Sequence, residues 1–127
     1  MVLKGPMEIL IVDDSSTIRL KFKAFLNAHG FIVHEAGSGF EGLDLLEKNR
    51  DIKLIISDLN MPEMDGMTFI EMVTNNEKTK DVPILVYTTE LSRVVKGQAK
   101  SLGVKAWIPK PFNQEKILEV IGKILLN

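Results

Sequence analysis

The sequence contains no cysteine, and this absence excludes several kinds of chemistry. Disulfide bonds, thiolate metal ligands and a thiol nucleophile cannot occur. No apolar run is long enough to cross a bilayer, and the chain shows no signal peptide. The formal net charge is only -1, so overall charge does not favour binding to nucleic acid. We therefore expect a cytoplasmic protein with no membrane partner and no direct nucleic-acid partner.

The chain also lacks internal repeats, low-complexity tracts and any interdomain linker. Its 127 residues, of which 45% are hydrophobic and 26% charged, suit one globular domain with one core. The first predicted strand begins at Glu8. We accordingly divide the chain into residues 1–7, a native arm or an extension from start-site choice or cloning, and residues 8–127, the domain.

Short apolar runs alternate with longer segments of helical periodicity. The runs predict strands over residues 8–12, 31–36, 54–58, 83–88 and 105–108. The other segments predict helices from residue 15 or 16 to 29, then over 38–49, 68–76 and 91–102, and from 113 to the end. Five strands alternating with five helices specify an α/β fold. With right-handed crossovers the result is a doubly wound, five-stranded parallel sheet.

Local patterns predict some details of these helices. Ser38 and Glu41 have the spacing of a capping box, which would start the second helix. In the third helix we expect Phe69, Met72 and Val73 to face inward.

Polar residues end four of the five predicted strands. Asp13 and Asp14 follow the first strand, Asp58 closes the third, Thr88 closes the fourth, and Lys110 follows the fifth. Ligands of such sheets bind at the carboxyl ends of the strands. We therefore expect three carboxylates, a hydroxyl and an amine at one sheet edge. Carboxylates this close repel unless a cation binds, and an all-oxygen set favours Mg²⁺, held weakly.

Each of these residues also has an ordinary structural explanation. Asp13 and Asp14 could open a helix, where acids favour the helix dipole, and Asp58 could form an Asx-turn. Thr88 could be a β-branched strand residue, and Lys110 a solvated lysine. The joint pattern favours a site, because all these explanations would have to hold independently at the same edge.

Three other residues with titratable side chains are candidates of lower priority. His29 lies near a helix end and His34 within the second predicted strand, so we expect neither to be catalytic. Glu90 either guides the phosphatase residue of a partner protein or is simply a solvated acidic residue in a loop.

In order along the chain, these motifs resemble the receiver domains of two-component response regulators, and especially the single-domain, CheY-like chemotaxis type. The resemblance covers residues 8–127 and rests on five elements, namely Asp13-Asp14, Asp58, Asn60-Met61-Pro62 with Gly66, Thr88, and Lys110-Pro111. It implies a flavodoxin-like (βα)5 receiver fold and a phosphorylation-activated signalling protein. Such a protein is not an enzyme acting on other molecules, since it catalyses only its own phosphorylation and dephosphorylation.

The resemblance implies how the acidic residues act. Asp58 would accept the phosphoryl group from a sensor histidine kinase or phosphotransfer protein. Asp14 and Asp58 would bind Mg²⁺ directly, Asp13 would hold its waters, and Asn60 would contribute its backbone carbonyl.

The resemblance also implies roles for the remaining motif residues. Thr88 would bond one phosphoryl oxygen and Lys110 would pair with another, and the peptide bond between Lys110 and Pro111 would be cis. Trp107 stands where the family usually carries a Tyr or Phe that moves together with Thr88 as a switch.

The fourth predicted helix carries Arg93, Lys96 and Lys100 at spacings of three and four residues, which place them on one side. This stripe is either a surface for a downstream protein target or a merely solvated face.

Four alternatives remain open at this point. A haloacid-dehalogenase-type phosphatase would need a second Asp where Asn60 stands, and an FMN carrier would have phosphate repelled by Asp13 and Asp14. A receiver-fold module that is never phosphorylated is a third alternative, and a receiver excised from a larger regulator is the fourth. The sequence does not identify the kinase or the target.

Overall fold

The computed structural model describes residues 6–111 and 113–126, and five strands alternate with five helices in this part of the chain. The elements are β1 (Glu8–Val12), α1 (Ser16–Ala28), β2 (Ile32–Ala36), α2 (Gly39–Lys48), β3 (Ile52–Ser57), α3 (Gly66–Thr74), β4 (Ile84–Thr88), α4 (Arg93–Ser101), β5 (Ala106–Pro109) and α5 (Gln114–Leu126).

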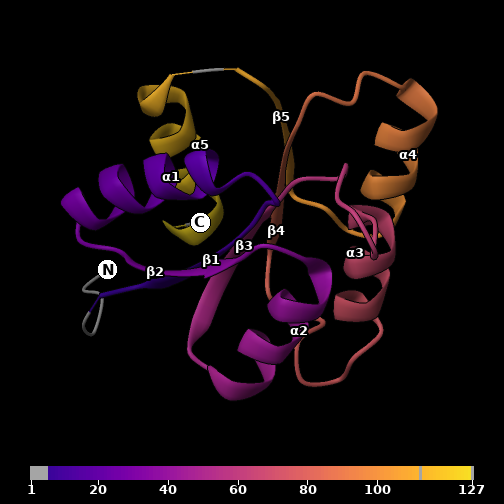
Figure 1. The fold of residues 1–127 in the computed structure, drawn as a ribbon, viewed down its shortest axis with the longest axis horizontal. Helices are drawn as coiled ribbons and strands as arrows, with labels where there is room; N and C mark the ends of the chain where they lie inside the picture. Colours follow the sequence, from indigo (N-terminus) through magenta and orange to yellow (C-terminus); the bar gives the residue numbers. More distant parts are fainter. Residues whose placement is uncertain (1–5, 112, 127) are drawn as a thin grey trace.

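The strands form one parallel sheet in the order β2-β1-β3-β4-β5. Helices α1 and α5 cover one face, and α2, α3 and α4 cover the other (Figure 1). This is the doubly wound architecture predicted from the sequence. Because β1 and β3 are neighbours although β2 lies between them in the chain, the strand order reverses beside β1, where ligands of such sheets bind.

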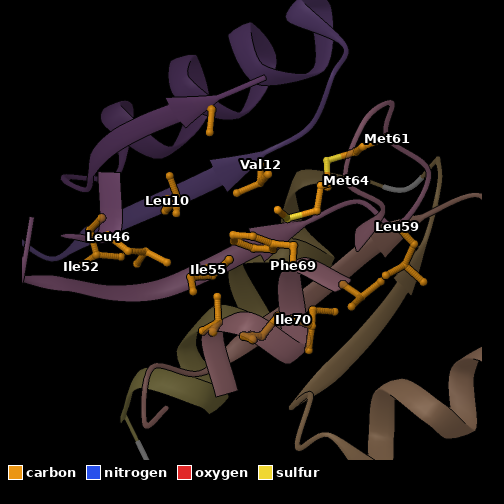
Figure 2. Close-up of a cluster of buried hydrophobic side chains, with 14 residues drawn as sticks. Leu10, Val12, Leu46, Ile52, Ile55, Leu59, Met61, Met64, Phe69 and Ile70 are labelled. Carbon is orange, nitrogen blue, oxygen red and sulfur yellow. The ribbon is translucent and has the colours of Figure 1, made fainter. Parts of the chain in front are cut away.

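Two hydrophobic clusters hold the helices against the sheet. Side chains alternate along β1, so that Ile9 and Ile11 face α1 and α5 whereas Leu10 and Val12 face α2 and α3. Figure 2 shows the cluster that contains Leu10 and Val12, with Phe69 of α3 at its centre. All four β1 residues are essentially inaccessible to solvent, which explains why β1 is almost continuously apolar.

Serine side chains cap the first two helices. The Ser15 hydroxyl accepts a hydrogen bond from the Ile18 amide at 3.3 Å, and the Ser38 hydroxyl accepts one from the Glu41 amide at 3.2 Å. The Glu41 carboxylate accepts from the amide of Gly37 at 2.8 Å, rather than from Ser38 as in a regular capping box. The expected cap at Ser38 is confirmed, but its reciprocal bond is shifted by one residue.

Some element boundaries differ from those predicted. Strand β3 ends at Ser57, so Asp58 follows the strand instead of closing it. Helix α3 starts two residues early, since the carboxylate of Asp65 caps it by accepting from the Thr68 amide at 2.8 Å. Helix α4 starts two residues late, because Ser92 is its N-cap.

The prediction that Met72 faces inward is wrong, since its side chain is 46% exposed. Ile70 is fully buried in its stead, together with Phe69 and Val73. At 3.6 residues per turn, a buried side that includes Ile70 is centred away from Met72.

Candidate phosphoacceptor site

Asp13 and Asp58 each lie one residue beyond the end of a central strand. The amide of Asp13 donates to the Ala36 carbonyl at 3.0 Å, and that of Asp58 donates to the Val12 carbonyl at 2.9 Å. The sheet hydrogen bonding therefore continues to both residues. Their position at this edge is set by the backbone of β1, β2 and β3.

The three predicted acidic residues come together at this edge. One carboxylate oxygen from each of Asp13, Asp14 and Asp58 lies within 4.8 Å of the others. Asp13 and Asp58 are buried, whereas Asp14 is exposed to solvent. The cluster is therefore open to solvent on the Asp14 side, where a cation can approach.

Lys110, which follows β5, reaches into the cluster. Its Nζ atom lies 2.8 Å from Asp13 Oδ2 and 3.0 Å from Asp58 Oδ2. The lysine side chain is only 12% exposed, so its charge is largely removed from water. One ammonium group thus bridges the two buried carboxylates.

The pKa values of Lys110 and Asp13 reflect opposing effects. Burial lowers the pKa of Lys110, but hydrogen bonds to Asp13 and Asp58 outweigh it and leave the pKa above the ordinary value of 10.5. Burial raises the pKa of Asp13 above 3.8, and the bonds from Lys110 and Ser15 do not fully compensate. The lysine stays charged, while the ionised form of Asp13 is disfavoured by its surroundings. A cation at the cluster would relieve that cost.

The loop after Asp58 fixes the direction of its carboxylate. Oδ1 accepts from the amides of Leu59 at 2.7 Å and Asn60 at 3.3 Å, which leaves Oδ2 on the Lys110 side. The same loop packs tightly against Gly66, where a Cβ atom would lie 2.3 Å from the Asp58 carbonyl oxygen. Only glycine fits at that position.

Met61 and Met64 anchor this loop. Both side chains are less than a tenth exposed and belong to the cluster drawn in Figure 2. They therefore act as packing residues beneath the loop.

Thr88 ends β4 and is completely buried. Its hydroxyl accepts from the Glu90 amide at 3.2 Å, and its carbonyl accepts from the Lys110 amide at 2.9 Å. The Glu90 carboxylate in turn accepts from the Ser92 amide at 3.0 Å. Glu90 thus helps to hold the loop between β4 and α4. The peptide bond from Lys110 to Pro111 is cis, as expected.

Trp107 lies on β5 opposite Val86 and is partly buried. It packs, like Val95 and Leu102 of the α4 region, against the cluster on the α2–α4 side of the sheet. Thr88 is two residues beyond Val86, so its side chain is directed to that same side.

The two histidines lie elsewhere, as expected. His34 Nε2 is 2.7 Å from Glu8 Oε1 at the start of β1, and His29 Nδ1 is 2.8 Å from the Phe25 carbonyl oxygen.

Sequence reasoning missed two residues that contact the site. The Tyr87 ring lies under Lys110, with Nζ 5.2 Å from the ring centroid, and stands edge-on to Phe22 of α1. Arg19 of α1 donates to the carbonyl of Asp13 at 2.7 Å. Strand alternation from Thr88 could have placed Tyr87 on the α1 side. No local pattern indicates that Arg19 turns back toward the preceding loop.

The donor set fits a hard divalent cation. The cluster offers carboxylate oxygens only, since the chain has no cysteine and both histidines lie elsewhere. Such a set suits Mg²⁺, which is usually bound by one or two carboxylates and several waters. The exposed position of Asp14 leaves room for those waters.

Comparisons with known proteins agree with this architecture and site. The sequence matches the response regulator receiver domain family over residues 9–122. It is 42% identical over 121 residues to a chemotaxis protein CheY homolog of Campylobacter jejuni, covering 91% of this chain and 93% of that relative. It is 38% identical over 120 residues to chemotaxis protein CheY1 of Helicobacter pylori, covering 94% and 97%.

A solved structure is similar over almost its whole length. Chemotaxis protein CheY4 of Vibrio cholerae superposes with a TM-score of 0.89 at 38% identity, covering 95% of this chain and all of that one. The chain therefore belongs to the response regulator receiver domain family, and the three relatives described above are chemotaxis proteins that it covers almost completely.

In the part of the chain that the structure describes, no helix is both long and apolar enough to span a membrane.

Proposed function

We propose that this protein is a phosphorylation-activated response regulator of a two-component, chemotaxis-type pathway, with Asp58 as the phosphoacceptor. The observation that carries the proposal is the position of the Asp58 carboxylate, which lies beside two further carboxylates and 3.0 Å from Lys110. The donor would be a sensor histidine kinase or a phosphotransfer protein.

The chemistry is transfer of a phosphoryl group to a carboxylate oxygen. An oxygen of Asp58 attacks the phosphorus, a new O–P bond forms, and the bond from phosphorus to the donor's nitrogen or oxygen breaks. The product is an aspartyl phosphate, a reactive mixed anhydride that suits a reversible signal. Bound Mg²⁺ would shield the two anions from each other and stabilise charge on the transferring oxygens.

Four residues are proposed to hold the Mg²⁺. Asp14 and Asp58 would bind it directly, Asn60 would contribute its backbone carbonyl, and Asp13 would act through bound water. The geometry supports the contrast between Asp14 and Asp13, because Asp14 is exposed whereas both oxygens of Asp13 are already engaged, one by Lys110 and one by the Ser15 amide at 2.9 Å. The oxygens of Asp58 are also engaged, so Asp58 would bind the cation directly once Lys110 leaves its Oδ2.

Lys110 and Thr88 are proposed to contact the phosphoryl group. Lys110 would move from the two carboxylates to an oxygen of the phosphoryl group, which as a whole carries more negative charge than the free Asp58 carboxylate did. Thr88 would turn its buried hydroxyl toward another phosphoryl oxygen and give up the bond from the Glu90 amide. Its movement would alter the loop before α4.

The output of this protein is proposed to be a contact with a downstream protein target, through a surface that includes Arg93, Lys96 and Lys100. These side chains are all exposed on α4. The names of the relatives point to chemotaxis as the process. The cytoplasmic location stays a prediction.

Intact mass spectrometry tests the proposal. The protein is incubated with acetyl phosphate, with Mg²⁺ and with EDTA in its place. We expect one phosphoryl adduct that needs Mg²⁺ and disappears in alkali. No adduct under either condition would indicate a receiver-fold module that is never phosphorylated. Steady turnover of varied phosphomonoesters would indicate a phosphatase instead.

A further inference from the structure

Asp14 is the acidic residue of the cluster that the rest of the protein holds least. Within residues 6–111 and 113–126, its exposed carboxylate accepts no hydrogen bond. The direction of its side chain therefore depends on the backbone from which it projects. That backbone is the peptide group whose carbonyl belongs to Asp13 and whose amide belongs to Asp14.

Arg19 holds this peptide group. Its Nη1 atom donates to the Asp13 carbonyl oxygen at 2.7 Å, from the second turn of α1 back across the loop. Every other contact of Asp13 involves a different group, since its amide bonds Ala36 and its carboxylate bonds Ser15 and Lys110. Among the described residues, the arginine is thus the partner that orients the carbonyl.

The other edge of the guanidinium is tied to the sheet. Its Nε atom lies 3.4 Å from Glu35 Oε1 on β2, and the second oxygen of Glu35 lies 3.5 Å from Lys23 Nζ. Glu35 is in the parallel ladder opposite Ile11 of β1, so it is a firm attachment point. The planar guanidinium can bond two acceptors at once, which a lysine ammonium on a flexible stem does less well.

The neighbouring loop leaves space for this arrangement. A Cβ atom on Gly37 would lie 3.3 Å from Nη1 and 3.7 Å from Cζ of Arg19, tighter than most such contacts. The absence of a side chain at Gly37 lets the guanidinium pass between the β2–α2 loop and the acidic loop. The amide of Gly37 is itself held by the Glu41 carboxylate.

We propose that Arg19 is a positioning residue for the Mg²⁺ site, which orients the Asp13–Asp14 peptide group and so directs the Asp14 carboxylate toward Asp58. This inference rests on the proposed function, because it assigns the cluster to Mg²⁺. Partners that orient metal ligands typically change metal affinity by about 10- to 100-fold.

The direction in which Mg²⁺ affinity changes distinguishes a positioning role of Arg19 from an effect of its charge. Arg19 is a cation close to a cation site, so removing its charge should by itself tighten Mg²⁺ binding through reduced repulsion. Loss of positioning should weaken binding. The two explanations therefore predict opposite changes for the same substitution.

The experiment is an NMR titration with Mg²⁺ alone, following the amides of Asp14 and Asp58. For Arg19→Gln we expect affinity to fall by roughly tenfold, and the Asp14 amide to shift even before Mg²⁺ is added. For Arg19→Lys, which keeps the charge but not the fork, affinity should also fall. Lys23→Gln is the matched control, since Lys23 shares Glu35 but has no contact with Asp13, and its affinity should equal that of the wild type.

Urea unfolding without Mg²⁺ shows that each variant is folded before it is titrated. If the wild type binds Mg²⁺ but Arg19→Gln or Arg19→Lys binds it equally or more tightly, the positioning role is wrong and the proposed function stands. An equal loss in Lys23→Gln would also overturn the role. Failure of the wild type to bind Mg²⁺ at these amides would overturn the inference and the proposed Mg²⁺ chemistry together.

Discussion

At the scale of single residues, Asp13 and Asp14 are neighbours in sequence with different environments. Asp13 is buried and its two oxygens are engaged, whereas Asp14 is exposed. We predict that Asp14→Ala weakens Mg²⁺ binding more than Asp13→Ala does, because a direct ligand is lost in one case and a water-mediated contact in the other. Mg²⁺ titration of both variants by NMR measures this. An equal loss, or a larger loss for Asp13→Ala, rejects the ranking.

The raised pKa of Asp13 predicts a dependence of stability on pH. Between 3.8 and the raised pKa, the folded chain keeps a proton that the unfolded chain releases. The contribution of Asp13 to the free energy of unfolding therefore grows as the pH falls through the raised pKa. This contribution reaches its full size once the pH is below 3.8, the ordinary pKa of the carboxyl group. Without Mg²⁺, the stability of the wild type should improve relative to Asp13→Asn over this interval.

Urea unfolding of both proteins, from neutral pH to about pH 4, checks this prediction. The difference between their free energies of unfolding reports on Asp13 alone, because the other carboxylates titrate in both proteins. A difference that is constant with pH, or that moves in favour of Asp13→Asn on acidification, contradicts the assigned cause.

At the scale of elements, α4 presents Arg93, Lys96 and Lys100 to solvent, while Ala99 is buried on its inner side. If the stripe binds the downstream target, replacing all three by Glu should slow association by about tenfold or more and flatten its salt dependence. The stopped-flow association rate at several ionic strengths measures the effect.

A matched control carries the same change in net charge elsewhere. Three exposed lysines lie outside α4, with Lys53 in β3 and both Lys78 and Lys80 between α3 and β4. Reversing these three should leave association nearly unchanged. Normal association of the α4 variant, or equal slowing in both variants, would mean that the stripe is only a solvated face.

Strand β5 offers a second element-scale prediction through Trp107, the only tryptophan. Its ring and the Thr88 side chain are on the same side of the sheet, so a movement of Thr88 toward the phosphoryl group would open space near the indole. Trp fluorescence should therefore change when Mg²⁺ and beryllofluoride, a phosphoryl mimic, are added together. The same addition to Asp58→Asn should have little effect.

NMR shows whether beryllofluoride has bound, which is needed to interpret an unchanged fluorescence spectrum. If beryllofluoride is bound at Asp58 while the emission and quencher access of Trp107 stay constant, then coupling between the site and α4 does not pass through this ring.

At the scale of the whole molecule, the fold was predictable because the strands of a doubly wound sheet are buried on both faces. Their apolar runs end in polar residues at one edge, so Asp13, Asp14 and Asp58 could be brought together from the sequence and the strand rule alone. The inward face of α3 was harder, since the choice between Ile70 and Met72 depends on which part of the helix meets the sheet.

Contacts that cross between elements were not predictable in the same way. The bond from Arg19 to the Asp13 carbonyl follows from the angle at which α1 leaves the loop. The bridge from Lys110 to both buried carboxylates follows from the distance between β5 and β1, which lie on either side of β3 and β4. Neither angle nor distance is encoded in a local pattern.

The central claim is that Asp58 alone carries the phosphoryl group, and reductive mapping tests it most directly. After incubation with acetyl phosphate and Mg²⁺, borohydride reduces an aspartyl phosphate to homoserine, and peptide mass spectrometry locates the converted residue. We predict conversion at Asp58 in the wild type and none in Asp58→Asn. Conversion at Asp13 or Asp14, or undiminished conversion in Asp58→Asn, would contradict the account.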